Sequence, residues 1–104
     1  MNQIILIGKV SKTLEIKESK NGYRLGNFLL EVERPYTNAE GDVDTDIFQI
    51  TIWRSLVDEF ENHCKVGDLI AIRGRLQANN YYKDDNEIYY RAEVVADKLI
   101  TFNN

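Results

Sequence analysis

Alternation of apolar and polar residues with a period of two is clearest over residues 46–53. One side of this segment carries three large apolar residues, which are Phe48, Ile50 and Ile52. The other side carries Ile47, Gln49, Thr51 and Trp53. Successive side chains of a β-strand point to opposite faces of the sheet. The pattern predicts a strand with one face in the core, and it places the single tryptophan of the chain on the face that meets water.

Four further segments have strand-like patterns. They cover residues 2–10, 25–34, 68–82 and 88–102. Asn21-Gly22 predicts a turn before the second of them, because both residues tolerate positive φ. Pro35 is expected to close the second strand, because proline cannot donate a hydrogen bond to a ladder. Residues 36–45 are polar and acidic and predict a long exposed loop, and residues 83–87 predict a turn.

Residues 55–67 contain the one helical candidate. Ser55 is expected to cap the helix with Asp58 three residues later, and Gly67 is expected to end it. The apolar stripe of this helix consists of Leu56, Phe60 and Cys64. Three strands, a short helix and two strands form the element order of the OB-fold. The sequence therefore predicts an all-β protein, a five-stranded Greek-key barrel with one short helix between strands three and four.

The bulk composition narrows the setting of this fold. A chain of 104 residues is long enough to bury its own core, so we expect residues 1–104 to form a single domain. The single cysteine excludes a disulfide within the chain. No run of residues approaches the length of a membrane span or a signal peptide, so a cytoplasmic protein without a membrane partner is expected. The net charge of −4 argues against strong binding to nucleic acid through overall charge.

Exposed aromatic residues are expected beside cations at several places. Tyr36 follows Arg34, and Trp53 is followed by Arg54. On the fourth strand the odd positions share a face, and they are Arg73, Arg75, Gln77, Asn79 and Tyr81. Bases of single-stranded nucleic acid stack on aromatic rings while cations follow the phosphates. Trp53 could be such a stacking platform, or it could cap a barrel end or fill a subunit interface.

Several blocks of the chain, in order, resemble the bacterial single-stranded DNA-binding protein family. They read NQIILIGKV, NGYRLGNFLLEVERPYTN, TDIFQITIWR and VGDLIAIRGRLQANNYY…YYRAEVVADKLITF. The resemblance implies an OB-fold that assembles into dimers and homotetramers and binds single-stranded DNA during replication, recombination or repair. It also implies a DNA-binding role for the aromatic positions Tyr36, Trp53 and Tyr81 and for cations at or beside Lys9, Arg34 and Arg54. Arg73 and Arg75 join this set from strand parity.

Some departures from the family pattern predict weaker binding. Gln3, Gln77 and Asn79 stand where members often carry Lys or Arg, and Glu31 and Glu33 add negative charge. Fewer phosphate contacts reduce affinity and flatten its salt dependence. The acidic C-terminal tail through which family members recruit replication enzymes is expected to be missing. The chain is therefore expected to be an accessory, plasmid, phage-type or specialised version, and a primosome-type OB protein is the related alternative.

Other chemistries find little support in the sequence. Adjacent His63 and Cys64 are too few for a zinc site, and Asp42, Asp44 and Asp46 lack the glycine and distal glutamate of a calcium loop. No phosphate-binding loop or nucleophile elbow occurs, so no catalytic residue, metal or cofactor is expected. The remaining alternatives to single-stranded DNA binding are an OB-fold adaptor for protein or RNA and, less favoured, a nucleic-acid hydrolase.

The first strand predicts self-association. Ile5 and Ile7 alternate with Ile4 and Leu6, so both faces of the strand are apolar. A small barrel has one interior, and the other apolar face needs a cover. The sequence therefore predicts an oligomer formed through this strand, at least a dimer and plausibly a tetramer.

Overall fold

The computed structural model describes residues 1–83 and 86–102. Its strands are β1 (Ile4–Glu18), β2 (Arg24–Thr37), β3 (Val43–Trp53), β4 (Leu69–Ala78), β5 (Tyr81–Tyr82), β6 (Ile88–Tyr89) and β7 (Ala92–Thr101). Helix α1 (Ser55–His63) lies between β3 and β4. The turn expected over residues 83–87 includes 84 and 85, which lie outside the described residues.

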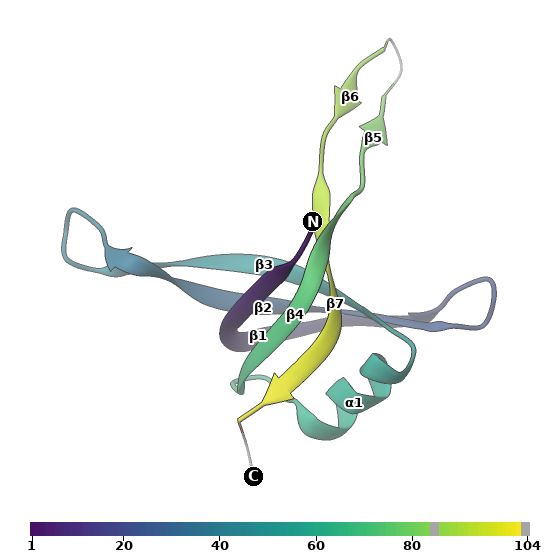
Figure 1. The fold of residues 1–104 in the computed structure, drawn as a ribbon, viewed down its shortest axis with the longest axis horizontal. Helices are drawn as coiled ribbons and strands as arrows, with labels where there is room; N and C mark the ends of the chain where they lie inside the picture. Colours follow the sequence, from purple (N-terminus) through teal and green to yellow (C-terminus); the bar gives the residue numbers. More distant parts are fainter. Residues whose placement is uncertain (84–85, 103–104) are drawn as a thin grey trace.

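The strands form a closed barrel in the order β1-β2-β3-β7-β4, with β5 and β6 as a separate two-stranded ribbon (Figure 1). Neighbouring strands are antiparallel except β3 and β7, which pair in parallel over only two positions, Ile50 with Val94 and Thr51 with Val95. Five strands closed in this order, with a helix between the third and fourth, make the OB-fold. The predicted fold class is confirmed.

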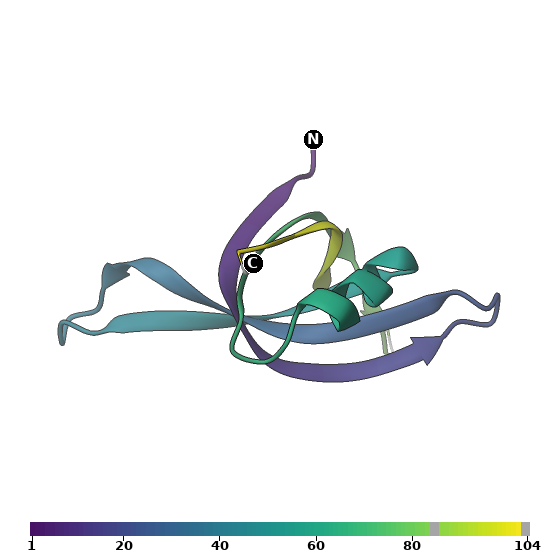
Figure 2. The same cartoon turned by 90° about the horizontal axis from the view of Figure 1, so that it is seen from below.

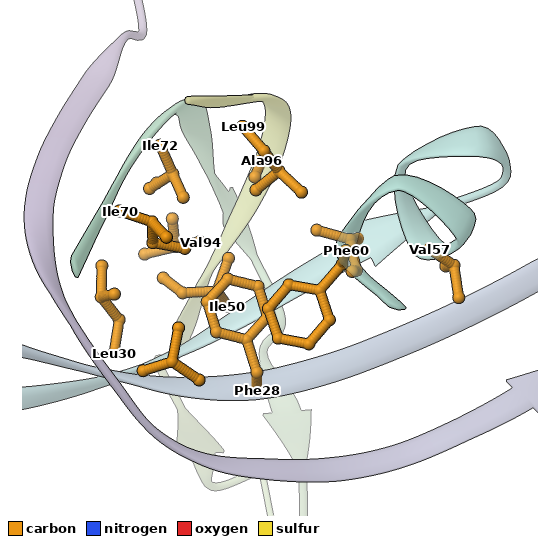
Figure 3. Packing of buried hydrophobic residues seen from close by; sticks show 12 residues of the cluster. Phe28, Leu30, Ile50, Val57, Phe60, Ile70, Ile72, Val94, Ala96 and Leu99 are labelled. Atoms are coloured by element: carbon orange, nitrogen blue, oxygen red, sulfur yellow. The ribbon is translucent and has the colours of Figure 1, made fainter. Parts of the chain in front are cut away.

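The barrel interior is filled by side chains at alternate strand positions. The largest fully buried ones are Phe28, Leu30, Ile50, Ile52, Ile70, Ile72 and Val10, and helix α1 adds the fully buried Val57. Phe28 of β2 stacks on Phe60 of α1, with ring centroids 4.4 Å apart and planes inclined by 16° (Figure 3). This contact fastens the helix to the barrel. The predicted core face of β3 is confirmed, since Ile50 and Ile52 are buried and Phe48 packs against them.

Three hairpin arms leave the barrel in the described part of the chain: β1–β2, β2–β3 and β5–β6 (Figure 1). Two sequence-based boundaries were wrong at the β2–β3 arm. Pro35 does not close the strand, because β2 continues to Thr37 through a register shift between Glu33 and Thr37. Proline is tolerated at such irregularities, where no ladder hydrogen bond is needed from its nitrogen. The expected loop 36–45 thereby shrinks to a turn over residues 38–42.

Other boundaries also moved. The first strand extends to Glu18 rather than ending near residue 10, whereas the turn at Asn21-Gly22 is confirmed, with φ of 80° at Gly22. The fourth and fifth predicted strands are each divided, into β4 with β5 and β6 with β7. Leu76, which shares the even positions of β4 with the buried Ile70 and Ile72, is 47% exposed. It pairs with the buried Val94 of β7, two residues before β4 ends at Ala78.

Helix α1 begins and ends differently from the prediction. Ser55 is its first residue, the preceding Arg54 occupies the cap position, and no side chain caps the helix. Asp58 instead binds Arg24 of β2, together with Glu61, whose Oε1 lies 2.7 Å from Arg24 Nη2. The helix ends at His63, and Gly67 takes its positive φ in the turn that follows. Figure 2 shows α1 lying along one side of the barrel, where it contacts β2, β3 and β7.

Candidate nucleic-acid interface

Trp53 lines a groove at the junction of β3, α1 and β7. The groove has a volume of about 570 Å³ and is lined by Tyr23, Trp53, Arg54, Ser55, Leu56, Arg75, Gln77, Val95, Ala96 and Asp97. The Trp53 side chain is 39% exposed, as the alternation in β3 predicted. One side of the indole therefore packs on the protein while the rest remains accessible from the groove. The structure brings three predicted site residues, Trp53, Arg54 and Arg75, to this one place.

Tyr23 joins this groove although strand periodicity did not indicate it. The guanidinium carbon of Arg54 lies 4.1 Å from the centroid of the Tyr23 ring, a cation–π contact. Arg54 reaches this position because its backbone takes a φ of 58° between β3 and α1, with its N–H donating to the Arg24 carbonyl at 2.8 Å. The available clue was cross-strand register, since Leu25 pairs with Trp53. A cation held against an aromatic ring beside an exposed indole suits a strand of stacked bases.

The predicted face of the fourth strand continues outward from this groove along the arm. Arg75 pairs with Val95, Gln77 with Glu93 and Tyr81 with Tyr89, so the β4–β7 and β5–β6 ladders share one register. The hydrogen bond of 2.8 Å from Asn79 N to Arg91 O joins them. Successive odd positions from Arg75 to Tyr81 therefore share one face of a continuous ribbon.

The outer part of this ribbon carries an aromatic pair. The Tyr81 and Tyr89 rings stack with centroids 6.1 Å apart, and the Arg91 guanidinium lies 5.6 Å from the Tyr81 centroid. Both tyrosines are about half exposed. Tyr89 and Arg91 were missed from the sequence, although their spacing from Tyr81 across a hairpin turn would have placed them beside it. The ribbon face thus repeats the combination of ring and cation found in the groove.

Thr51, which was expected in water, is buried at 4% exposure. Its Oγ1 lies 3.0 Å from Asn27 Oδ1 and 3.1 Å from Glu93 Oε2. The parallel contact between β3 and β7 brings Glu93 over this position and covers it. Beside this cluster lies a hollow of about 450 Å³ lined by Ile47, Phe48, Gln49, Asn79, Arg91, Ala92, Glu93 and Val94. A carboxylate therefore lies between the groove and the arm and opposes the field of the cations.

Arg34 and Tyr36 lie away from the groove, on the β2–β3 arm. Tyr36 is 60% exposed. The Arg34 guanidinium forms a fork on Asp46, with Nη2 2.8 Å from Oδ1 and Nε 3.1 Å from Oδ2. These hydrogen bonds, with the charge of Asp46, raise the pKa of Arg34 above its usual value and lower the pKa of Asp46. The cation predicted for a phosphate is already bound to a carboxylate.

Arg73 and Lys9 also lie outside the groove. Arg73 Nε is 3.1 Å from Asp97 Oδ1, at a bulge where the β4–β7 register shifts. Lys9 pairs with Glu31 and Leu69 in its two ladders and lines a small hollow with Glu31 and Glu33. Both cations face carboxylates rather than an aromatic ring. The predicted cations therefore divide into Arg54 and Arg75 beside Trp53, and Lys9, Arg34 and Arg73 beside acids.

The single cysteine, Cys64, lies directly after helix α1 and is free. Burial raises the pKa of the half-buried Cys64 thiol to about 11, with added effects from Asp68 and Glu59, which keeps it protonated at neutral pH. Across residues 1–83 and 86–102, no three His, Cys, Asp or Glu side chains gather closely enough to hold a metal ion. No helix in these same residues has the length and apolar character needed to cross a membrane.

Comparison with known proteins places this barrel in a family. Residues 1–102 match the family model described as the single-strand binding protein family. The chain belongs to this family.

Three relatives show the extent of the similarity. "Single-stranded DNA-binding protein 2" of Staphylococcus aureus strain Mu50 is 32% identical over 99 residues, covering 95% of this chain and 70% of that protein. "Single-stranded DNA-binding protein 1" of Streptococcus pyogenes serotype M18 is 34% identical, with coverage of 95% and 76%. "Single-stranded DNA-binding protein" of Oceanobacillus iheyensis is 30% identical, with coverage of 95% and 62%. The chain thus spans roughly 60 to 75% of the length of these relatives.

A solved structure has the same fold. The structure titled "Plasmodium falciparum SSB complex with ssDNA" superposes with a TM-score of 0.81, at 21% identity, covering 99% of this chain and 96% of the other. At this identity the similarity supports the barrel topology, and the roles of individual side chains must come from the geometry of this chain.

Proposed function

We propose that this chain binds single-stranded DNA without reading its sequence, through base stacking on exposed aromatic rings and a small number of phosphate contacts. The observation that carries the proposal is the groove in which Tyr23, Trp53, Arg54 and Arg75 converge. Membership of the single-strand binding protein family supports it, as do the names of the relatives. Rings beside cations on an OB-fold sheet offer stacking surfaces that any base can use.

The same strip of surface supplies a path for the strand. From the groove the ribbon face continues through Gln77 and Asn79 to the stacked pair Tyr81 and Tyr89. We place the first bases on Trp53 and Tyr23 and later bases on the arm. Tyr36 on the β2–β3 arm is a further proposed stacking residue, and Lys9, Arg34 and Arg73 are proposed as secondary phosphate contacts because carboxylates oppose each of them.

The charge distribution predicts a shallow salt dependence. For single strands, each phosphate contact makes the slope of log affinity against log salt more negative by about 0.7. With Arg54 and Arg75 as the principal contacts, we expect a slope of about −1 to −2 per protomer and far weaker binding to duplex, whose bases are not open for stacking. Titrations of oligo-dT, a mixed-sequence strand and a duplex over a salt series measure both. Equal affinity for duplex and single strand would contradict base stacking, and preference for single-stranded RNA or for a protein would favour the adaptor alternative.

We further propose that the chain forms a homo-oligomer through the outer face of β1, a dimer or a homotetramer. Ile5 and Ile7 are 66% and 54% exposed, and Ile100 of β7 is 41% exposed. Ala71 of β4 lies between Ile7 and Ile100 in the ladders and is itself only 6% exposed. Leu69 is exposed on the same strand as Ala71. Exposed neighbouring apolar side chains of this kind mark association surfaces.

Replacing Ile7 with glutamate should therefore shift the protein toward monomers at micromolar concentration. The charge would be buried without a partner at the interface, which costs far more than the lost apolar contact. Light scattering coupled to size-exclusion chromatography measures the change, with Val66→Glu as a control at a residue that is similarly exposed at 57% but follows α1. A wild-type monomer, or an oligomer unaffected by Ile7→Glu, would contradict this interface.

The cellular role follows as part of the proposal. We propose that residues 1–104 act as one binding domain in the cytoplasm, supporting DNA replication, recombination or repair by holding single strands rather than by catalysing a reaction. A single closed barrel around one continuous hydrophobic core supports the assignment of one domain. The absence of nuclease activity toward labelled single strands, measured with added magnesium, is the expected result.

A further inference from the structure

The cations of the candidate interface differ in how they are held. Arg54 rests on the Tyr23 ring, whereas Arg34 presents its fork to Asp46 through Nε and Nη2. A second carboxylate, Asp44, lies behind this pair with Oδ2 3.9 Å from Arg34 Nη1. Paired, parallel hydrogen bonds from a guanidinium are also the way in which arginine binds a phosphate. Asp46 thus occupies the donors that a DNA phosphate would need.

The surroundings keep this pair open to exchange. The side chains of Arg34, Asp46 and Asp44 are 41%, 39% and 47% exposed. Exposed ion pairs in water contribute little to stability, so replacing the Asp46 carboxylate by an incoming anion costs little free energy. Asp44 is held in place from the turn, because Asn38 Nδ2 donates to Asp44 Oδ1 at 3.1 Å. The exposed Tyr36 lies two residues beyond Arg34 on the same arm.

We propose that Asp46, supported by Asp44, acts as an internal competitor for Arg34, so that the β2–β3 arm contacts DNA only when a phosphate replaces the Asp46 carboxylate. This proposal rests on single-stranded DNA binding as the proposed function and adds a residue that limits it. The release of Asp46 offsets most of the gain from the new phosphate contact. Strong binding is then confined to the Trp53 groove and the ribbon, and the arm joins once the strand is already held nearby, where its effective concentration is high.

The consequence is a specific asymmetry between the two partners. Removing Arg34 from the native protein removes a secondary contact that Asp46 already limits, so binding should fall slightly. Removing the charge of Asp46 frees that cation, so binding should improve. If the Arg34–Asp46 ion pair only stabilised the hairpin, the result would be different. Loss of either residue would then destabilise the arm and weaken its binding.

The test compares Asp46→Asn with Asp42→Asn in titrations of labelled oligo-dT between about 50 and 200 mM salt. Asp42 lies in the turn of the same arm, so both substitutions remove one negative charge from the same region, but only one of them frees Arg34. We expect Asp46→Asn to raise affinity about three- to tenfold at the lower salt and to steepen the slope by about 0.7, the value for one added contact. Asp42→Asn should give a smaller rise, with the slope unchanged.

Two further variants complete the cycle. Arg34→Gln alone should lower affinity, by no more than about twofold, as expected for a secondary contact, and combining Arg34→Gln with Asp46→Asn should abolish the gain of Asp46→Asn. Equal effects of Asp46→Asn and Asp42→Asn, a gain that survives in the double variant, or a loss of affinity in Asp46→Asn would each overturn the competition. If the unaltered protein fails to bind oligo-dT, the proposed function falls and this proposal with it. Binding by the unaltered protein without the Asp46 effect refutes this proposal alone.

Discussion

Replacing Trp53 with alanine is expected to weaken binding of oligo-dT by roughly 5- to 150-fold, because the stacking of one base on an aromatic ring contributes about 1–3 kcal/mol. The indole is 39% exposed and lies beside Tyr23 and Arg54, so a base stacked on it would also meet the cation. Since Trp53 is the single tryptophan, the variant has no intrinsic indole signal. Fluorescence anisotropy of a labelled strand measures the affinity of both proteins.

Two controls separate stacking from packing in this experiment. Trp53→Phe keeps a ring in the groove and should recover most of the affinity. Thermal unfolding followed by far-ultraviolet circular dichroism should show that the alanine variant stays folded, because the wall of Trp53 that faces the protein lies outside the buried core cluster. An alanine variant that unfolds, or that binds oligo-dT with undiminished affinity, would assign Trp53 to packing instead.

Local alternation predicted those features of the site that depend on a single strand. The side on which Trp53 lies, the common face of Arg75, Gln77 and Tyr81, and the exposed apolar face of β1 all follow from a period of two. Thr51 breaks the same rule in β3, since it is buried on the outward face. Its burial comes from Glu93 of β7, a residue 42 positions away in sequence, and periodicity within one strand carries no information about such a neighbour.

The charge pairing was hidden by errors in strand boundaries. With Pro35 as the expected end of a strand and residues 36–45 as a loop, Asp46 had no assigned partner across the hairpin. The actual strands pair Val32 with Asp46 and place Arg34 two residues further along β2, within reach of the carboxylate. The hairpin register would have revealed this pair. The bond from Arg73 to Asp97 depends on a bulge in β7, and no pattern in the sequence marked that bulge.

The pairing changes how the negative net charge should be understood. Arg34 and Arg73 contribute to the net charge, but each is bound to a carboxylate. Arg54 and Arg75, in contrast, line the groove that contains the aromatic rings. Binding should therefore depend on placement more than on total charge. A chain with a net charge of −4 can still offer a single strand a short cationic and aromatic path.

That path depends on helix α1, whose first turn supplies Ser55 and Leu56 to the groove. The helix is anchored in the core by the stack between Phe60 and Phe28, which is fully buried. Replacing Phe28 with alanine should lower the free energy of unfolding by about 3–5 kcal/mol, because the change removes a large buried side chain and leaves a cavity. Urea denaturation followed by circular dichroism at fixed protein concentration measures this loss, the fixed concentration being needed for a protein expected to self-associate.

Phe102→Ala is the matched control, because it removes the same side chain at a position that is 54% exposed. Surface substitutions of this kind usually change stability by no more than about 0.5 kcal/mol. At temperatures where the Phe28→Ala variant remains folded, its affinity for oligo-dT should fall only through a looser attachment of α1. This loss should be much smaller than the loss in the Trp53→Ala variant. A destabilisation below about 1 kcal/mol would mean that the stack does not anchor the helix. The groove would then have to be held by the ion pairs from Arg24 to Asp58 and Glu61, which are exposed and therefore individually weak.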